Sequence, residues 1–388
     1  MVSAAAASAA VYLDHNATTP IAPQVLDAMR PYLERHFGNP SSAHRCGAAA
    51  SEAVAAARLD VSALLGCEPE CIVFTGSGSE ADNLALKGIS LARRGDGDHI
   101  ITSAIEHPAV LGACRYLEAR LGYRLTIVPV DGSGVVDPDD VLRAIEPGTV
   151  LISVMHANNE VGTLQPIAEI AWLARERGIA MHTDAAQSVG KIAVDVDGLG
   201  VDLLTVAGHK MYATKGIGAL YVRRGARLDP LVHGGGQERG IRAGTENVPY
   251  MAGLGAACAL AGRRLRAGAP LEIMRLRDRL HEALRSAVPG LVLNGHPEHR
   301  LPNTLNVSFP ARDGESLLEQ TPAVAAATGA ACHSGRNEPS AVLTAMGVGP
   351  ERALGAVRLS LGYDTTAADV DAAAAALTAT VAADIAHA

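Results

Sequence analysis

The alternation of short apolar runs with helical stretches is the feature that most limits what this chain can fold into. The apolar runs have the length and the β-branched content of buried strands. The predicted strands are Ile72–Thr75, His99–Ser103, Leu125–Val130, Val150–His156, Ile179–Asp184, Leu203–Val206 and Ala219–Val222. The predicted helices lie near Glu80–Arg94, Ala109–Leu121, Pro138–Ile145 and Ile167–Arg177. This order is typical of a parallel sheet with helical crossovers, so we predict an α/β fold.

The composition changes after about Asn247, where long helices rich in Ala, Leu and Arg begin. Three further apolar runs follow, and an Ala-rich helix begins at Ala367. These runs are Leu291–Asn294, Thr304–Phe309 and Val357–Leu361. We therefore expect a second, smaller α+β domain. The expected division is a flexible tail over residues 1–10, a large domain over 11–260 and the small domain over 261–388. Residues 11–25 of the large domain are able to pack with the small domain.

The overall composition is that of a globular chain, with 388 residues, of which 48% are hydrophobic and 19% charged. A formal net charge of −8 argues against a surface that binds nucleic acid or anionic membranes. Residues 1–10 lack the basic and bulky apolar parts of a signal peptide, and no apolar run reaches the roughly 20 residues of a membrane helix. We expect a cytoplasmic protein without a nucleic-acid or membrane partner.

The six cysteines, at positions 46, 67, 71, 114, 258 and 332, are scattered along the chain. Their scatter in a chain without an export signature predicts no disulfide framework. Cys67 and Cys71 are too far apart for a CxxC pair, so we predict no metal site. Five of the six are expected to be small buried hydrophobic residues, and Cys332 is the exception.

Lys210 follows the strand that ends at Val206, in the turn Gly208–Gly218. A lone lysine there is usually a solvated loop residue, but Asp184 ends another predicted strand 26 positions earlier. A lysine that binds the aldehyde and a carboxylate that keeps the pyridine nitrogen protonated are what pyridoxal phosphate needs. The pair therefore indicates a site for this cofactor.

Other polar residues also follow predicted strands, where ligands bind in open α/β sheets. Gly76–Glu80 is a glycine-rich turn that opens a helix, which is either an ordinary cap or an anion site. His107 is either a cap or a side chain that stacks on a ring and moves protons. Asn158 and Asn159 either form a turn or donate to a phenolic oxygen.

Several motifs together resemble those of the cysteine desulfurases, which are fold-type-I pyridoxal phosphate enzymes of the class-V aminotransferase family. The matching stretches include Tyr12–Pro20, Gly38–Ser42, Ser77–Glu80, Glu106–His107, Asn158–Glu160, Asp184–Gln187, Gly208–Lys210, Arg242–Asn247, Gly329–Cys332 and Arg358–Gly362. The resemblance covers all but about the first ten residues. It implies a large domain with a mostly parallel seven-stranded sheet flanked by helices, and a smaller α+β domain.

The resemblance also implies roles for individual residues. Lys210 would hold pyridoxal 5′-phosphate and act as the base, Asp184 would pair with the ring nitrogen, and His107 would stack on the ring and transfer protons. The ring oxygen would be bound by Gln187 and Asn159. The phosphate would be bound by Gly78, Ser79, His209 and, from a second subunit of a homodimer, Thr245. L-cysteine would be bound by Arg358 through its carboxylate, in a pocket lined by Asn16 and Ala17.

Cys332 distinguishes a desulfurase from a generic aminotransferase. A thiolate there can attack the sulfur of the substrate and hold it as a persulfide, whereas in isolation Cys332 would be a bystander thiol. The spacing from Cys332 to Pro339 resembles that of the subgroup with a long loop. A departure lies at Ala207, where many relatives carry a serine that binds the phosphate.

The expected function is conversion of L-cysteine to L-alanine, with the sulfur passed from Cys332 to an acceptor protein. Iron–sulfur cluster assembly, tRNA thiolation and DNA phosphorothioation remain open as the pathway. A selenocysteine lyase is an alternative, because residues 329–334 also resemble that branch. A catalytically silent sulfur-transfer scaffold is a second alternative, and the presence of Lys210 and Cys332 argues against it.

Overall fold

The computed structural model describes residues 10–328 and 338–385. Its main element is a seven-stranded sheet with the order β2-β8-β7-β6-β5-β3-β4. The strands are β2 (Ile72–Thr75), β3 (His99–Ser103), β4 (Arg124–Val128), β5 (Thr149–Ser153), β6 (Ala180–Asp184), β7 (Leu203–Ala207) and β8 (Gly218–Val222). The predicted α/β fold with a mostly parallel sheet is therefore confirmed.

Strand β8 is the exception to the parallel arrangement, because it pairs antiparallel with both β7 and β2. The connection from β7 to β8 contains only the 3₁₀ turn η2 (Gly208–Lys210). A parallel pair needs a crossover of about a dozen residues or more, usually a helix. The short connection forces the chain to turn back, and it places Lys210 at the edge of the sheet.

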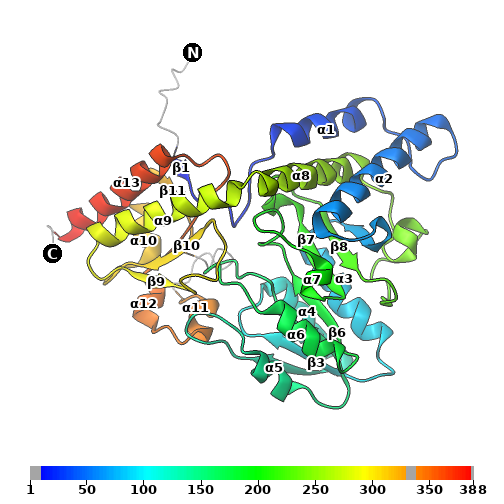
Figure 1. The fold of residues 1–388 in the computed structure, drawn as a ribbon, viewed down its shortest axis with the longest axis horizontal. Helices are drawn as coiled ribbons and strands as arrows, with labels where there is room; N and C mark the ends of the chain where they lie inside the picture. The colour runs from blue at the N-terminus through cyan, green and yellow to red at the C-terminus, as the bar shows by residue number, and fades with distance from the viewer. Residues whose placement is uncertain (1–9, 329–337, 386–388) are drawn as a thin grey trace.

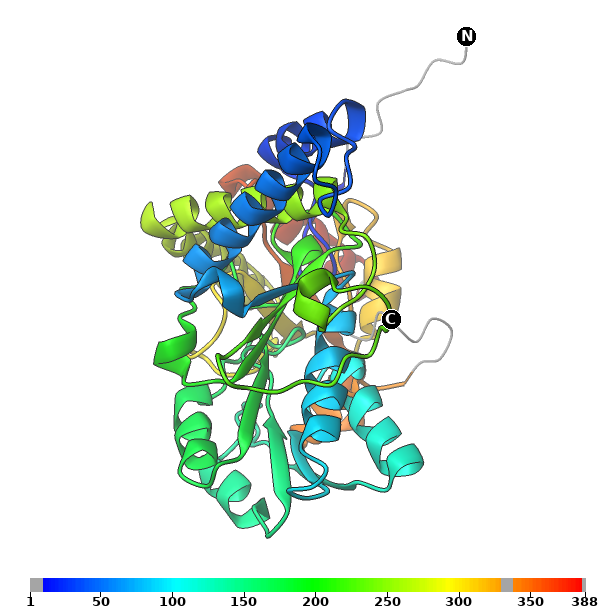
Figure 2. The same cartoon turned by 90° about the vertical axis from the view of Figure 1, so that its right-hand side faces the viewer.

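Helices cover both faces of this sheet (Figure 2). On one face, α3 (Gly78–Ala92) and α4 (Pro108–Leu121) pack against strand side chains such as Val73 and Ile100. On the other face lie α2 (Arg45–Leu65), α5 (Pro138–Ala144), α6 (Ile167–Arg175) and α8 (Val248–Arg266). Ile72 and Phe74, the neighbours of Val73, point to this second face, as the two-residue period of a strand requires.

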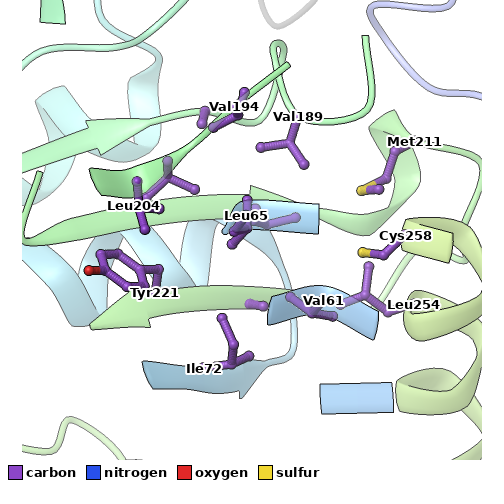
Figure 3. Close-up of a cluster of buried hydrophobic side chains, with 14 of the residues drawn as sticks. Val61, Leu65, Ile72, Val189, Val194, Leu204, Met211, Tyr221, Leu254 and Cys258 are labelled. Atoms are coloured by element: carbon purple, nitrogen blue, oxygen red, sulfur yellow. The ribbon is translucent and has the colours of Figure 1, made fainter. Parts of the chain in front are cut away.

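Figure 3 shows part of the core on this second face, where side chains of α2 and α8 meet those of the sheet. Helix α2 and the preceding α1 (Pro23–Glu34) were not predicted from the sequence. Both pack along α8. A Cβ at Gly255 of α8 would lie 2.7 Å from the Cα of Ala57, so the close approach of α2 and α8 requires a glycine there.

A second sheet has the order β12-β10-β9 and is antiparallel throughout. Its strands are β9 (Val292–Asn294), β10 (Thr304–Ser308) and β12 (Ala356–Ser360). The helices around it are α9 (Ala269–Ala287), α10 (Gly314–Glu319), α11 (Ala341–Ala345), α12 (Pro350–Leu354) and α13 (Ala367–Ile385), of which α9 and α13 lie side by side (Figure 1).

The N-terminal segment joins this smaller sheet region. Strand β1 (Val11–Tyr12) pairs with β11 (Val324–Ala325), and Leu13 is fully buried in the core around α9 and α13. The chain then crosses to the large sheet, where Thr19 accepts a hydrogen bond from Tyr212. The boundary near residue 260 stays a prediction.

Within the described residues, no helix has the length and apolar character needed to cross a membrane. The described cysteines form no disulfide, and no cluster of potential metal ligands occurs among the described residues. Three of these cysteines, Cys71, Cys114 and Cys258, are buried as expected. The expectation of burial is wrong for Cys46, which is exposed, and Cys67 is only partly buried.

Candidate active site

The residues that follow β2, β3, β5, β6 and β7 lie along one edge of the large sheet. Parallel strands bring their carboxyl ends to the same edge, and β2 runs in the same direction as β7 because β8 is antiparallel to both. The N-terminal segment, after β1, comes across to this edge and contacts Lys210. The candidate site is built where these segments meet.

Lys210 lies at the end of η2 and is partly buried. Its Nζ donates to the backbone oxygens of Asn16 at 2.7 Å and Ala17 at 2.8 Å. The turn that carries it includes Tyr212, whose φ of 69° is unusual for a residue with a side chain. The amine is thus held between the large sheet and the N-terminal segment.

Asp184 ends β6 and is only 6% exposed. Burial raises the pKa of its carboxyl group, while the N–H of Ala186, donated to Oδ1 at 2.9 Å, and the nearby His107 and Lys210 lower it. Within the described residues, Oδ2 accepts no hydrogen bond. A buried carboxylate with one unused oxygen is suited to a cationic N–H group such as a pyridinium.

A possible phosphate site lies at the N-terminus of α3. Ser77 caps the helix by accepting the N–H of Glu80 at 3.0 Å, and Glu80 in turn accepts the N–H of Gly76 at 2.8 Å. A Cβ at Gly78 would lie 2.8 Å from the Cβ of Ala207, so this turn packs directly on the end of β7. Ser79 is exposed in the first turn, where helix N–H groups and the helix dipole favour an anion.

His209 lies beside this turn in η2, and its Nδ1 is 3.2 Å from the hydroxyl oxygen of Thr18. Burial, with the charges of Lys210 and Lys215, lowers the pKa of His209 to about 4. The ring is therefore neutral at neutral pH, and a neutral imidazole is able to donate a hydrogen bond to an anion without adding a full charge.

His107 caps α4, and its Nδ1 accepts the N–H of Ala109 at 3.1 Å. Burial lowers the pKa of His107; Asp184 opposes this effect and Lys210 adds to it. A neutral ring whose Nδ1 accepts a hydrogen bond carries its hydrogen on Nε2. His107 thus serves as the cap, and it lies near enough to Asp184 and Lys210 for their charges to shift its pKa; stacking on a ring and proton transfer stay predictions.

The two consecutive asparagines after β5 have different tasks. Asn158 is fully buried, donates to the backbone oxygen of Ile105 and accepts from the N–H groups of Glu160 and Val161. It forms the turn. Asn159 is half-buried, and in the described residues only its backbone oxygen is engaged, by Asn16 and Arg358. Its amide group remains for a ligand.

Arg358 on β12 comes from the smaller sheet and is 3% exposed. Its guanidinium donates to Asp14 Oδ1 at 2.7 Å and to the backbone oxygen of Asn159 at 3.1 Å. Its Nε has no hydrogen-bond partner among the described residues. The guanidinium is therefore positioned at the junction of both sheets with N–H groups left for a carboxylate.

Gln187 and Asn16 meet near Lys210. Gln187 Nε2 donates to the backbone oxygen of Asn16 at 3.0 Å, which is the same oxygen that Lys210 contacts. Asn16 is 1% exposed, and its Nδ2 donates to Thr304 at 2.8 Å. One predicted site residue of the described chain, Thr245, is exposed and is not brought to this cluster, and the predicted Cys332 lies outside the described residues.

Lys191 is a buried residue of this cluster that the sequence analysis missed. Its Nζ donates to Gln187 Oε1 and Asn16 Oδ1. The only sequence signal is its position four residues after Gln187. Asp82 on α3 was also missed; it is buried near Asp184 and Glu106, which raise its pKa in addition to the larger effect of burial.

The residues present fit pyridoxal phosphate. An amine, a buried carboxylate and a helix N-terminus suited to an anion lie around one site, with a histidine and an amide between them. These are the groups that the aldehyde, the ring nitrogen, the phosphate, the ring face and the ring oxygen require. Fold and site together define a pyridoxal phosphate enzyme of the fold-type-I class.

Comparison with known proteins places the chain more exactly. The family model described as aminotransferase class-V matches residues 11–373, and the chain belongs to this family. The cysteine desulfurase IscS of Methanosarcina thermophila is 50% identical over 364 residues, which cover 93% of this chain and 89% of the relative. The cysteine desulfurase IscS of Dictyoglomus turgidum is 46% identical, with 93% and 92% covered.

Among solved structures, one titled NifS-like protein superposes with a TM-score of 0.90 at 36% identity, covering 96% of this chain and 99% of that one. Within the aminotransferase class-V family, the chain has the function of a cysteine desulfurase. This confirms the function predicted from the sequence motifs.

Proposed function

We propose that Lys210 binds the aldehyde carbon of pyridoxal 5′-phosphate while Asp184 pairs with its ring nitrogen. The observation that carries this assignment is the placement of Lys210 in the turn after β7 and of the buried Asp184 at the end of β6. The charges of both residues also shift the pKa of His107, in opposite directions. Gly78, Ser79 and His209 bind the phosphate at the start of α3. Gln187 and Asn159 donate to the ring oxygen.

The bound cofactor supplies an electron sink for the bonds at the substrate α-carbon. The protein positions those bonds and moves the protons. Arg358 binds the carboxylate of L-cysteine, and Asn16 and Ala17 line the pocket beside it. With its amine free, Lys210 takes the proton from the α-carbon. His107, whose neutral ring carries its hydrogen on Nε2, transfers protons where the substrate meets the cofactor ring.

Sulfur transfer is assigned to Cys332, which lies outside the described residues. Its thiolate attacks the substrate sulfur, and the new S–S bond forms as the bond between the β-carbon and sulfur breaks. The β-carbon then takes up a proton, and the α-carbon regains the proton that Lys210 removed, which gives L-alanine. The persulfide sulfur then passes to an acceptor protein in iron–sulfur cluster assembly, tRNA thiolation or DNA phosphorothioation. A cytoplasmic location also stays a prediction.

The active unit is a homodimer in which Thr245 contacts the phosphate in the neighbouring subunit. The exposure of Thr245 and the anchoring of its segment by Arg242, whose Nε donates to Glu80 at 2.7 Å, support this role. Sedimentation analysis at micromolar concentration measures the active species. An active monomer would show that the assignment of Thr245 is wrong.

The cofactor assignment is tested by reconstitution of the cofactor-free protein with pyridoxal phosphate. Borohydride reduction followed by peptide mass spectrometry is expected to locate the cofactor on Lys210. The Lys210→Arg variant keeps the charge beside Asn16 and Ala17 but lacks the primary amine, so it is expected to fold without covalent cofactor. Reduced cofactor on a different lysine would overturn the assignment.

A further inference from the structure

Lys191 is a second lysine of the active site. It is 8% exposed, and it lines the same small cavity as Lys210, together with Tyr212 and Asn303. Its Nζ lies 2.7 Å from Gln187 Oε1 and 2.9 Å from Asn16 Oδ1. Within the described residues these neutral amide oxygens are its hydrogen-bond partners, and it forms no ion pair with a carboxylate.

This arrangement is costly for the fold. Burial lowers the pKa of Lys191 well below its usual value, and the charges of Lys210 and Arg358 lower it further. An ion buried without a counter-charge costs about several kcal/mol, and an apolar side chain of the same size would avoid that cost. A lysine at this position therefore points to a task in the site.

The chemistry of the Lys191 amine limits what that task is. The Nζ group has N–H groups for both amides in either protonation state, three as an ammonium and two as a neutral amine, and both amides turn their oxygens toward it. The Gln187 amide then directs Nε2 away from Lys191, where one N–H reaches the backbone oxygen of Asn16 at 3.0 Å. The second N–H of Nε2 has no partner among the described residues.

The orientation of Asn16 is fixed by the same contact and by Asn303, which donates to Oδ1 at 3.0 Å. Asn16 also carries the backbone oxygen that receives both Lys210 and Gln187. Through Asn16, Lys191 thus links Lys210, which binds the aldehyde, with Gln187, which faces the neighbouring ring oxygen.

We propose that Lys191 is a positioning residue that holds Oε1 of Gln187, so that this amide presents an N–H group, and not an oxygen, to the anionic ring oxygen of pyridoxal phosphate. The inference rests on the proposed cofactor site. Without Lys191, the Gln187 amide loses the donor that holds its oxygen, and only the Nε2 hydrogen bond to Asn16 then opposes a half-turn that brings this oxygen against that anion.

The test uses the cofactor-free full-length protein and two probes, pyridoxal phosphate and its 3-deoxy analogue, which lacks the ring hydroxyl. Lys191→Met keeps the size of the side chain and removes the charge. It is expected to weaken pyridoxal phosphate binding by about ten- to a hundredfold more than binding of the analogue, which is the range for one hydrogen bond to an ionised group. Fluorescence titration measures both dissociation constants.

Gln187→Glu is the second variant, and it does not depend on the folding of Lys191→Met. A carboxylate beside Lys191 is expected to raise the melting temperature of the cofactor-free protein, because it supplies the missing counter-charge. The same carboxylate is expected to weaken pyridoxal phosphate binding more than analogue binding, because it presents oxygen to the ring oxygen.

A purely structural role for Lys191 predicts a different pattern. Lys191→Met would then weaken binding of both probes equally, and this result overturns the inference. Gln187→Glu that binds pyridoxal phosphate as tightly as the wild type would show that Gln187 does not face the ring oxygen, which also overturns the inference. Failure of the proposed function is distinguishable, because the wild-type protein itself would then carry no reducible cofactor on Lys210.

Discussion

The guanidinium of Arg358 and the carboxylate of Asp14 form a hydrogen-bonded ion pair with an Nη2–Oδ1 distance of 2.7 Å, although 344 positions separate them in the sequence. Asp14 follows β1, and Arg358 lies on β12. The pair holds the expected substrate-binding group in place before substrate arrives, and it supplies a counter-charge for a guanidinium that is 3% exposed.

Replacing Asp14 with asparagine is expected to lower the free energy of unfolding by about 1 to 3 kcal/mol, because a buried guanidinium loses its charged acceptor. L-alanine, whose carboxylate takes the place of Asp14, is expected to raise the melting temperature of this variant more than that of the wild type. Thermal unfolding with and without L-alanine measures both effects.

Asp371→Asn is the matched control for this experiment, because it breaks an exposed pair with Arg279. Exposed ion pairs contribute little to the free energy of unfolding, so the melting temperature of Asp371→Asn is expected to change only slightly. L-alanine should raise the melting temperature of this variant and of the wild type by the same amount. An Asp14→Asn protein as stable as the wild type would show that the pair does not support Arg358.

The buried carboxyl group of Glu106 predicts a pH dependence of stability. Burial raises its pKa from 4.5 to about 8, although Ser103 and the N–H of Met155 donate to Oε1. Oε2 has no hydrogen-bond partner among the described residues. A pKa above the unfolded value means that the folded state binds more protons, so this contribution to stability is complete below pH 4.5 and is lost as the pH rises toward 8.

Glu106→Gln keeps the acceptor oxygen and removes the titration. The stability of the wild type relative to this variant is therefore expected to fall between about pH 5 and pH 8. Urea unfolding of the two cofactor-free proteins over this pH range measures the difference between their free energies of unfolding. The contributions of the other titrating groups cancel in this difference. Parallel pH profiles would mean that Glu106 is ionised in the folded protein.

Ala207→Ser is expected to tighten binding of pyridoxal phosphate by about tenfold. Ala207 ends β7 with its Cβ against Gly78, so a hydroxyl there lies beside the start of α3. A hydrogen bond to an anionic phosphate contributes about 1.5 to 3 kcal/mol, of which part is lost in fixing the side chain. Equilibrium titration of the cofactor-free protein measures the change.

The control for this substitution is Ala207→Val, which adds carbon where there is no room beside Gly78 and is expected to weaken binding. Pyridoxal without the phosphate group should bind Ala207→Ser and wild type alike. An equal gain for pyridoxal would assign the effect to something other than the phosphate.

Lys210 and Cys332 are expected to act separately. Lys210→Ala should lose covalent cofactor and alanine formation with L-cysteine and L-selenocysteine. Cys332→Ser should keep the cofactor absorbance but stop desulfuration, because a serine hydroxyl attacks sulfur poorly. Selenium is able to leave as the neutral element while the β-carbon keeps the electron pair of the carbon–selenium bond and takes up a proton, so this variant is still expected to release alanine from selenocysteine. Undiminished alanine from L-cysteine with Cys332→Ser would exclude the persulfide mechanism.

The sequence by itself determined the strands and the residues at their ends. The strands β2 and β3 have the predicted bounds. Asp184 lies at the end of β6 and Lys210 lies in the turn after β7, as predicted. These features depend on neighbours along the chain, because apolar runs mark buried strands and the carboxyl ends of parallel strands share an edge. The resemblance of the sequence motifs to those of the cysteine desulfurases predicted the reaction and the cofactor.

Only the tertiary structure decided how the remaining groups are used. It assigned Asn158 to the turn, left the amide of Asn159 for a ligand, and joined Asp14 to Arg358. It also buried Lys191 against Asn16, 175 positions away. No local pattern encodes such contacts, because they arise where the N-terminal segment and two sheets pack together, and burial and hydrogen bonding there depend on residues far apart in sequence.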